Sequence, residues 1–299
     1  MKQFAAFYAV LAAALYAVSI PVAKLFLTDV SPLMLSALLY LGSGIGMALI
    51  GILQKVSHAK PDGEKITKSD FPYIIGMILL NTAALACLIL GLTTASTSNV
   101  SLLNNIEICA TALFAMLFFR EKVSKRLWIA IGLVTAAGII LSIEGGEAFS
   151  FSTGSLLVIL ACVFWGLENN CTRVLPTKSP LKISVIKGIF AGIAGLILAL
   201  CAGEWFPNPS ILPAVLLLGF AAYGLSIFFY IIAQRYLGAA KTSTYYAVSP
   251  FIASGLSLLI FREIPSMQFI IALAIMALGV YFASALTKKE NVACRHKNH

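Results

Sequence analysis

The chain has 299 residues, of which 60% are hydrophobic and 11% are Asp, Glu, Lys or Arg. Roughly a quarter of the residues in an average water-soluble domain are charged, so this composition excludes a protein that folds alone in water. The formal net charge is +9, which could indicate a nucleic-acid partner. The basic residues instead separate long apolar runs, so we expect no nucleic-acid partner and take the lipid bilayer as the solvent.

Apolar runs long enough to cross a hydrocarbon core of about 30 Å recur along the whole chain. The first five are residues 4–26, 32–53, 72–92, 97–119 and 127–143. The second five are residues 153–174, 181–202, 211–234, 240–261 and 267–286. The sequence therefore predicts an all-α membrane protein of ten transmembrane helices, with a polar loop at 55–70 and a cytoplasmic polar tail at 288–299.

The basic residues predict the orientation of these helices. Of the 21 Lys and Arg residues, Lys187 lies within a predicted span, and only Lys24 and Arg262 fall in one of the two sets of alternate connections. The remainder fall in the other set, and connections rich in Lys and Arg stay in the cytoplasm. We therefore expect a multi-pass protein of the cell membrane with both termini cytoplasmic.

The chain matches itself at a nearly constant spacing. Residues 11–19 (LAAALYAVS) align with 160–168 (LACVFWGLE), 31–33 (SPL) with 179–181, and 119–121 (FRE) with 261–263. These matches predict two related five-helix units, residues 1–145 and 150–287. Because five is odd, the second unit enters the membrane from the opposite face, which gives the inverted repeat of many secondary transporters.

Three segments resemble a known family. They are 117–121 (LFFRE), its counterpart 259–263 (LIFRE) after Ser249-Pro250, and 165–173 (WGLENNCTR). In these segments the chain resembles the drug/metabolite transporter superfamily, and in particular its ten-helix EamA type, over residues 4–286. The resemblance implies transport of small metabolites such as amino acids, nucleotide sugars or organic cations. Glu107-Ile108 stands where the second half has Ser249-Pro250, so a role for that proline is not carried over to the first half.

Glu107 lies within a predicted span, where a charge is costly. Ser101, Asn104, Glu107 and Thr111 recur at helical spacing and share one face. One interpretation is a carboxylate in a central cavity that binds a proton or a cation. The other is a structural Glu that forms hydrogen bonds with Asn104 or Asn105 between packed helices.

Glu168 and Lys187 are the other charged residues inside spans. They lie equally far from the centre of the connection between their helices, so a helical hairpin would place them at the same depth. We predict an ion pair that either locks the fold or opens when substrate or proton binds, although Lys187 could also extend to the membrane surface. The adjacent Asn169 and Asn170 predict a helix interruption or a lined cavity.

Aromatic and glycine residues complete the candidate site. Trp165, Tyr223 and Tyr246 could line a cavity and face an organic cation or an aromatic ring, or they could anchor helix ends at the membrane interface. The Gly42/Gly46 and Gly188/Gly192 spacings are typical of close helix packing.

Motifs for other chemistry are missing. The sequence has no Walker A loop, GxGxxG, HExxH or GxSxG motif, and its six cysteines lack metal-ligand spacing. We expect no enzyme activity, metal or cofactor. We expect a proton-coupled exporter of small polar or cationic metabolites that works by alternating access. Its expected partners are the metabolite, protons and the lipid bilayer, and a homodimer is a possible assembly. The alternatives are an uptake or exchange carrier, a membrane-embedded lipid-modifying enzyme, or a passive channel.

Overall fold

The computed structural model describes residues 4–56, 66–119, 125–144, 150–172, 175, 179–237, 245–246 and 248–296. The elements of the first half are α1 (Ala5–Ala17), α2 (Ser19–Phe26), α3 (Pro32–Val56), the short 3-10 helix η2 (Lys68–Asp70), α4 (Phe71–Thr94), α5 (Thr97–Leu103), α6 (Ile106–Phe119) and α7 (Lys125–Ser142).

The second half begins with a small hairpin. Strands β1 (Ile143–Glu144) and β2 (Ser150–Phe151) pair antiparallel, a small exception to the predicted all-α class. The helices that follow are α8 (Thr153–Thr172), α9 (Pro180–Cys201), α10 (Leu212–Gly219), the π-helix η3 (Phe220–Leu225), α11 (Ser226–Leu237), α13 (Ser249–Phe261) and α14 (Met267–His296).

Most of the predicted apolar runs form helices, but some runs are divided into two helices and some helices end at other residues than predicted. The run 4–26 is divided at Val18, 97–119 at Asn104 and Asn105, and 211–234 contains the π-helix η3. Helix α14 continues past residue 286 to His296, into the segment predicted as a polar tail. Residues 240–244 and 247 of the run 240–261, and most of the 55–70 loop, lie outside the described residues.

Proline lies in the first turn of several helices. It occupies the first or second position of α4, α9, α10 and α13. The first amide groups of a helix have no partner within the helix, so proline's missing N–H costs nothing there. These prolines therefore fix where the apolar helices begin.

Six helical segments among the described residues are long and apolar enough to cross a membrane. They are Ala5–Phe26, Pro32–Val56, Lys68–Thr94, Thr153–Thr172, Leu181–Cys201 and Leu212–Tyr230. Shorter apolar helices are Cys109–Phe118, Trp128–Ile140, Ser249–Phe261 and Met267–Phe282. Large apolar side chains lie exposed on several of them, including Leu79, Leu117, Leu217 and Leu259. Water would disfavour such a surface, whereas lipid chains would cover it.

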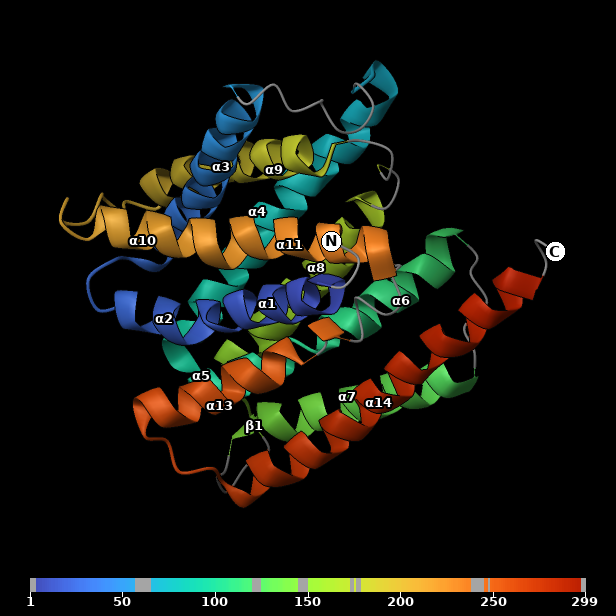
Figure 1. Cartoon of the computed structure of the whole chain (residues 1–299). Helices are drawn as coiled ribbons and strands as arrows, with labels where there is room; N and C mark the ends of the chain where they lie inside the picture. Colours follow the sequence, from blue (N-terminus) through green and yellow to red (C-terminus); the bar gives the residue numbers. More distant parts are fainter. Residues whose placement is uncertain are drawn as a thin grey trace.

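The helices pack in pairs that join the two halves. Helix α3 packs on α9, α4 on α8, α1 on α11 and α7 on α14; Figure 1 shows α7 and α14 together along one side of the bundle and α3 and α9 on the opposite side. Along the α3/α9 pair, Ala37 faces Gly195 and Gly51 faces Leu181. The two helices therefore run antiparallel.

The predicted close helix packing at the two glycine pairs is confirmed. Gly188 and Gly192 approach α3, whereas Gly42 approaches the backbone of α10 and Gly46 approaches the Phe220 side chain of η3. Gly44 is the residue of α3 that meets Gly188. Close backbone approach is a common basis of helix association in membranes, so these glycines set the separation of α3 from α9, α10 and η3.

Candidate functional site

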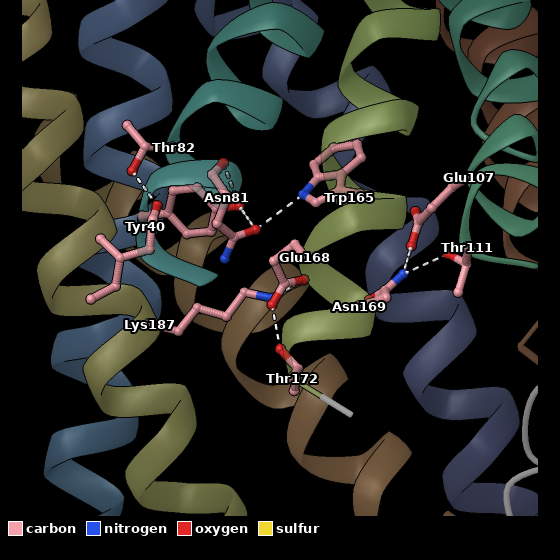
Figure 2. Close-up of polar contacts among 11 residues, drawn as sticks. Tyr40, Asn81, Thr82, Glu107, Thr111, Trp165, Glu168, Asn169, Thr172 and Lys187 are labelled. Carbon is pink, nitrogen blue, oxygen red and sulfur yellow. Dashed lines mark hydrogen bonds and ion pairs between the residues drawn. The ribbon is translucent and has the colours of Figure 1, made fainter. Parts of the chain in front are cut away.

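Helix α8 carries the polar residues around which the candidate site forms. Trp165, Glu168 and Asn169 lie in its middle and last turns. Successive helix residues are rotated by about 100°, so Glu168 and Asn169 point to different neighbours. Figure 2 shows Glu168 directed toward α9 and Asn169 directed toward Glu107.

Glu107 reaches α8 because α6 approaches α8 closely. A Cβ atom on Gly166 would lie 2.6 Å from the Cβ of Ala110, so only glycine fits this contact. The approach lets the Asn169 Nδ2 donate to Glu107 Oε1 at 2.8 Å and to Thr111 Oγ1 at 3.1 Å. The Glu107 carboxylate is thus held by an amide, and no ion pair to it occurs in the described part of the chain.

Glu168 instead has a cationic partner. Lys187 Nζ lies 3.1 Å from Glu168 Oε2, and the Thr172 hydroxyl donates to Glu168 Oε1 at 2.6 Å. The side chains of Lys187 and Glu168 are 18% and 2% exposed. The ion pair predicted from the hairpin is confirmed, and its two charges neutralise each other inside the bundle.

The predicted helix interruption at Asn169 and Asn170 is wrong. Helix α8 continues through both residues to Thr172. The Asn170 Nδ2 donates to the Gly166 carbonyl at 2.8 Å and to the Thr111 carbonyl at 3.1 Å. Partners within α8 and on α6 therefore satisfy the NH₂ group of this side chain without a break in the helix.

The interruption lies at Asn104 and Asn105, between α5 and α6. A broken helix leaves backbone carbonyls that lipid cannot satisfy. The Asn105 Nδ2 donates to the Leu102 carbonyl at 3.1 Å, and the Cys162 Sγ lies 3.6 Å from the Leu103 carbonyl. Side chains of α8 and of the break itself thus replace the missing helix hydrogen bonds.

The break also divides the predicted polar face. Ser101, on α5, lies 3.4 Å from the Ser257 hydroxyl of α13, whereas Glu107 and Thr111, on α6, face Asn169. Asn104 is buried at the break, where its Oδ1 lies 3.9 Å from Cys162 Sγ. The alternative in which Asn104 holds Glu107 is not what the described hydrogen bonds show, since Asn169 fills that role.

Asn81 and Tyr40 belong to the site, although sequence reasoning did not select them. The Asn81 Oδ1 accepts from the Tyr40 hydroxyl at 2.6 Å and from Trp165 Nε1 at 3.0 Å. Asn81 is fully buried, and Trp165 and Tyr40 are nearly so. The available signal was that Asn81 and Thr82 interrupt an otherwise apolar run.

The other predicted aromatic residues lie around Tyr16 of α1. The Tyr16 ring centroid is 5.8 Å from that of Tyr223 and 5.8 Å from that of Tyr246. Tyr223 also lies 5.9 Å from Tyr40, and Tyr246 lies 5.0 Å from Tyr230. The rings form a connected group, and Tyr40 links this group to Asn81 and Trp165.

The polar groups of this site differ in how their charges are compensated. No cluster of His, Cys, Asp or Glu that could hold a metal ion occurs among the residues the structure covers. The site offers one carboxylate with neutral partners, one neutralised ion pair and a group of aromatic rings. Such a set can bind a proton or a small cation.

Comparison with known proteins identifies the family. The model of the EamA-like transporter family matches residues 3–143 and again residues 152–285. The chain belongs to the EamA-like transporter family. The resemblance noted in the sequence is thereby confirmed. Membership of this family supports transport of small molecules across a membrane.

Several relatives of this EamA-like transporter carry transporter names. An "uncharacterized transporter" of Methanothermobacter thermautotrophicus is 26% identical over 89% of this chain and 82% of its own length. The inner membrane transporter YedA of Escherichia coli K12 is 26% identical over 74% of this chain and 71% of its own. A probable UDP-sugar transporter protein, SLC35A4 of Xenopus tropicalis, is 26% identical over 62% of this chain and 61% of its own.

A solved crystal structure of another protein shares the fold of this EamA-like transporter. The two chains superpose with a TM-score of 0.68 at 17% sequence identity, over 95% of this chain and 97% of the other. At this identity the likeness concerns the fold alone. It covers both halves of the chain.

Proposed function

We propose that this EamA-like transporter exports small polar or cationic metabolites in exchange for protons. The observation that carries the proposal is the environment of Glu107, which lies inside the bundle with the Asn169 amide as its described hydrogen-bond partner. A carboxylate held only by neutral groups in a membrane is costly when ionised. It therefore gains from binding either a proton or a cationic cargo.

The neighbouring ion pair supports assigning this role to Glu107 rather than Glu168. Lys187 already neutralises Glu168 at 3.1 Å, so the cluster carries one uncompensated negative charge when Glu107 is ionised. One proton or one monovalent cation restores neutrality. Proton and cargo would then compete for the same carboxylate, which couples the outward movement of one to the inward movement of the other.

An anionic cargo fits this site poorly. One relative is named a probable UDP-sugar transporter, but a diphosphate near an ionised Glu107 would be repelled. The single uncompensated carboxylate favours a cationic or neutral metabolite. Uptake or exchange of the same cargo is the alternative direction, because alternating access is reversible.

We further propose that the six long and four shorter apolar helices form ten spans in two inverted five-helix repeats. The family model matches the chain twice, and α3 and α9, which correspond in the sequence alignment of the halves, run antiparallel. Exchanging the halves converts the α4/α8 contact into the α1/α11 contact, and both contacts occur. This packing supports a twofold axis in the membrane plane, about which the halves could alternate.

Flux measurements in proteoliposomes test proton coupling. Purified protein would be reconstituted with a radiolabelled amine inside, and a proton gradient would be imposed from outside. We expect the gradient to accelerate efflux by wild type and to have no effect on Glu107→Gln. Asp29→Asn, at an exposed position beside Thr28, is the matched control and should behave as wild type. Gradient-driven flux that persists in Glu107→Gln would reject the proposal.

A further inference from the structure

An apolar groove lies between α4 and α9 on the outer surface of the bundle. Its volume is about 260 Å³, which is room for a hydrocarbon chain of roughly nine methylene groups, each about the size of a water molecule. Its lining is apolar and includes Ile75, Ile78, Leu79, Phe190, Ile193 and Ile197. All of these side chains except Ile78 are exposed. The two packed helices thus leave a hollow that the rest of the described chain does not cover.

Helices α4 and α9 begin at the same end of the bundle. Near their starts, Ile74 of α4 and Ile183 of α9 belong to one apolar cluster. Eight residues further along each helix, the Thr82 hydroxyl donates to the Ala191 carbonyl at 3.3 Å. The two helices therefore run parallel, and the groove between them follows the direction of the spans. The proposed topology places both helix starts at the cytoplasmic surface.

Each of the two helices has an exposed lysine at this end. Lys68, in η2 just before α4, precedes Leu79 by eleven residues, and Lys182, in the first turn of α9, precedes Ile193 by eleven. Eleven residues are about three helical turns and rise about 16 Å, which is half of a hydrocarbon core of about 30 Å. Each lysine therefore lies on the groove side of its helix, at the membrane surface when the lining residue is at mid-membrane.

The charge of these lysines is not used inside the chain. Neither Lys68 nor Lys182 forms an ion pair with a residue that the structure describes. The neighbouring Asp70 is engaged with Thr67 in the cap of η2, where its carboxylate accepts from the Thr67 N–H at 2.7 Å. The two lysines thus offer positive charge to a partner outside the chain.

The groove and the lysines select different parts of one lipid. A hydrocarbon chain gains little by moving from bulk lipid into an apolar groove, because lipid tails are as apolar as the groove. A preference for one lipid must then come from its headgroup. Basic residues at the cytoplasmic ends of spans attract anionic headgroups, so this end of the groove favours a negatively charged phospholipid.

We propose that the groove between α4 and α9 binds an acyl chain of an anionic phospholipid whose phosphate group lies between Lys68 and Lys182. The chain follows the groove from the cytoplasmic surface to mid-membrane. The bound lipid holds together the two helices that carry Asn81 and Lys187 of the candidate site. Only the choice of leaflet rests on the proposed topology, and the binding itself does not depend on proton coupling at Glu107.

Titration with two lipids tests the headgroup. Phosphatidylglycerol and phosphatidylcholine with the same acyl chains would be added to the purified full-length chain in detergent micelles. Ligands that bind the folded state raise its thermal unfolding midpoint. We expect the half-saturating concentration of phosphatidylglycerol to be roughly five- to thirtyfold lower, which is the effect of one or two lysines near an anionic lipid.

Lysine variants locate the headgroup. In Lys68→Gln/Lys182→Gln the two lipids should bind alike. Lys55→Gln is the matched control, because it removes an exposed lysine from the same end of α3. Helix α3 contacts α9 at Gly188 and Gly192, and residues two positions apart from Phe190 point away from the groove, since each helix residue turns by about 100°. This control should keep the preference for phosphatidylglycerol.

Photocrosslinking locates the acyl chain. A trace of phosphatidylglycerol with a diazirine in its acyl chain, in excess phosphatidylcholine, should label residues 75–79 and 190–197 preferentially, as read by mass spectrometry. Ala194→Trp fills the groove, which Ala194 helps to line, and should lose this labelling. Leu217→Trp, at an exposed position on α10, should retain it. The lysine variants alter exposed positions, so they keep the test decisive if Ala194→Trp fails to fold.

Three results would overturn the assignment. The first is equal half-saturating concentrations for the two lipids in wild type, and the second is labelling spread evenly over the exposed helix faces. The third is light scattering that gives a dimer for wild type and a monomer for Ala194→Trp, because a second copy of the chain would then occupy the groove.

Discussion

Lys187 Nζ and Glu168 Oε2 lie 3.1 Å apart between α9 and α8. Glu107, which contacts the residue next to Glu168, has the Asn169 amide rather than a cation as its partner. The two carboxylates, one on α8 and one that contacts α8, thus differ in whether a positive charge compensates them. On this difference we base the proposal of a structural role for Glu168 and an exchanging role for Glu107.

Removing one member of the ion pair should destabilise the protein strongly. In Lys187→Met, the nearly buried Glu168 loses its counter-charge, and breaking a buried pair typically costs about 3–5 kcal/mol. We expect a lower thermal unfolding midpoint in detergent than for Lys182→Met, which removes an exposed lysine from the same helix. The double variant Lys187→Met/Glu168→Gln should recover part of the loss. A midpoint equal to that of Lys182→Met would show that the pair is not needed for stability.

A methyl group at Gly188 should disrupt the α3/α9 contact. A Cβ atom there would lie 2.4 Å from the backbone nitrogen of Gly44, which cannot move as a flexible side chain can. We expect Gly188→Ala to destabilise the protein by about 1–3 kcal/mol, as overpacking does. Gly132→Ala is the matched control, because its Cβ would meet nothing within 4 Å. Thermal unfolding midpoints of the two variants are compared with that of wild type. Similar midpoints for both variants would contradict the packing described.

Glu204 should stabilise the start of α3. Its Oε2 accepts from the Met34 backbone N–H at 2.7 Å, which satisfies a first-turn amide and places a negative charge at a helix N-terminus. We expect Glu204→Ala to cost about 1 kcal/mol of stability. Glu204→Gln keeps an acceptor without the charge and should cost less. If thermal unfolding shows the two variants equal to wild type, the capping contact contributes nothing measurable.

The proposed inverted topology predicts which residues face the cell exterior. Single cysteines in a cysteine-free chain at Asp29 and Asn208, both exposed, should react with a membrane-impermeant maleimide in intact cells. A cysteine at the exposed Lys68 should react only after permeabilisation. Labelling is read as a mass shift on a gel. Reaction of all three positions from the same side would contradict the ten-span topology.

The sequence predicted those features that depend on local pattern. Apolar runs predicted most of the helices, because a membrane span requires continuous apolar length. The hairpin geometry predicted the pair between Glu168 and Lys187, since both residues lie on consecutive helices at the same depth. Close helix packing at Gly188 and Gly192 also followed from a short motif.

Features that depend on tertiary partners were predicted less well. Two asparagine pairs occur in the apolar runs, and the pair at 104–105 divides a helix while the pair at 169–170 does not. Asn170 donates to the Gly166 carbonyl of its own helix and to the Thr111 carbonyl on α6, whereas Asn105 donates to Leu102 within its own turn. None of these partners can be read from the local sequence. Asn81 was missed for the same reason, because its role depends on Tyr40 and Trp165.

Infrared difference spectroscopy on the purified protein tests most directly whether Glu107 exchanges a proton. A protonated carboxyl group has a carbonyl stretching band that disappears on ionisation. Every titrating carboxyl group of the chain contributes to the difference between acidic and alkaline pH, so we compare spectra of the variants with that of wild type. We expect one component band that wild type and Glu168→Gln share to be missing from Glu107→Gln. A band that persists unchanged in Glu107→Gln, or that is lost only in Glu168→Gln, would contradict the account.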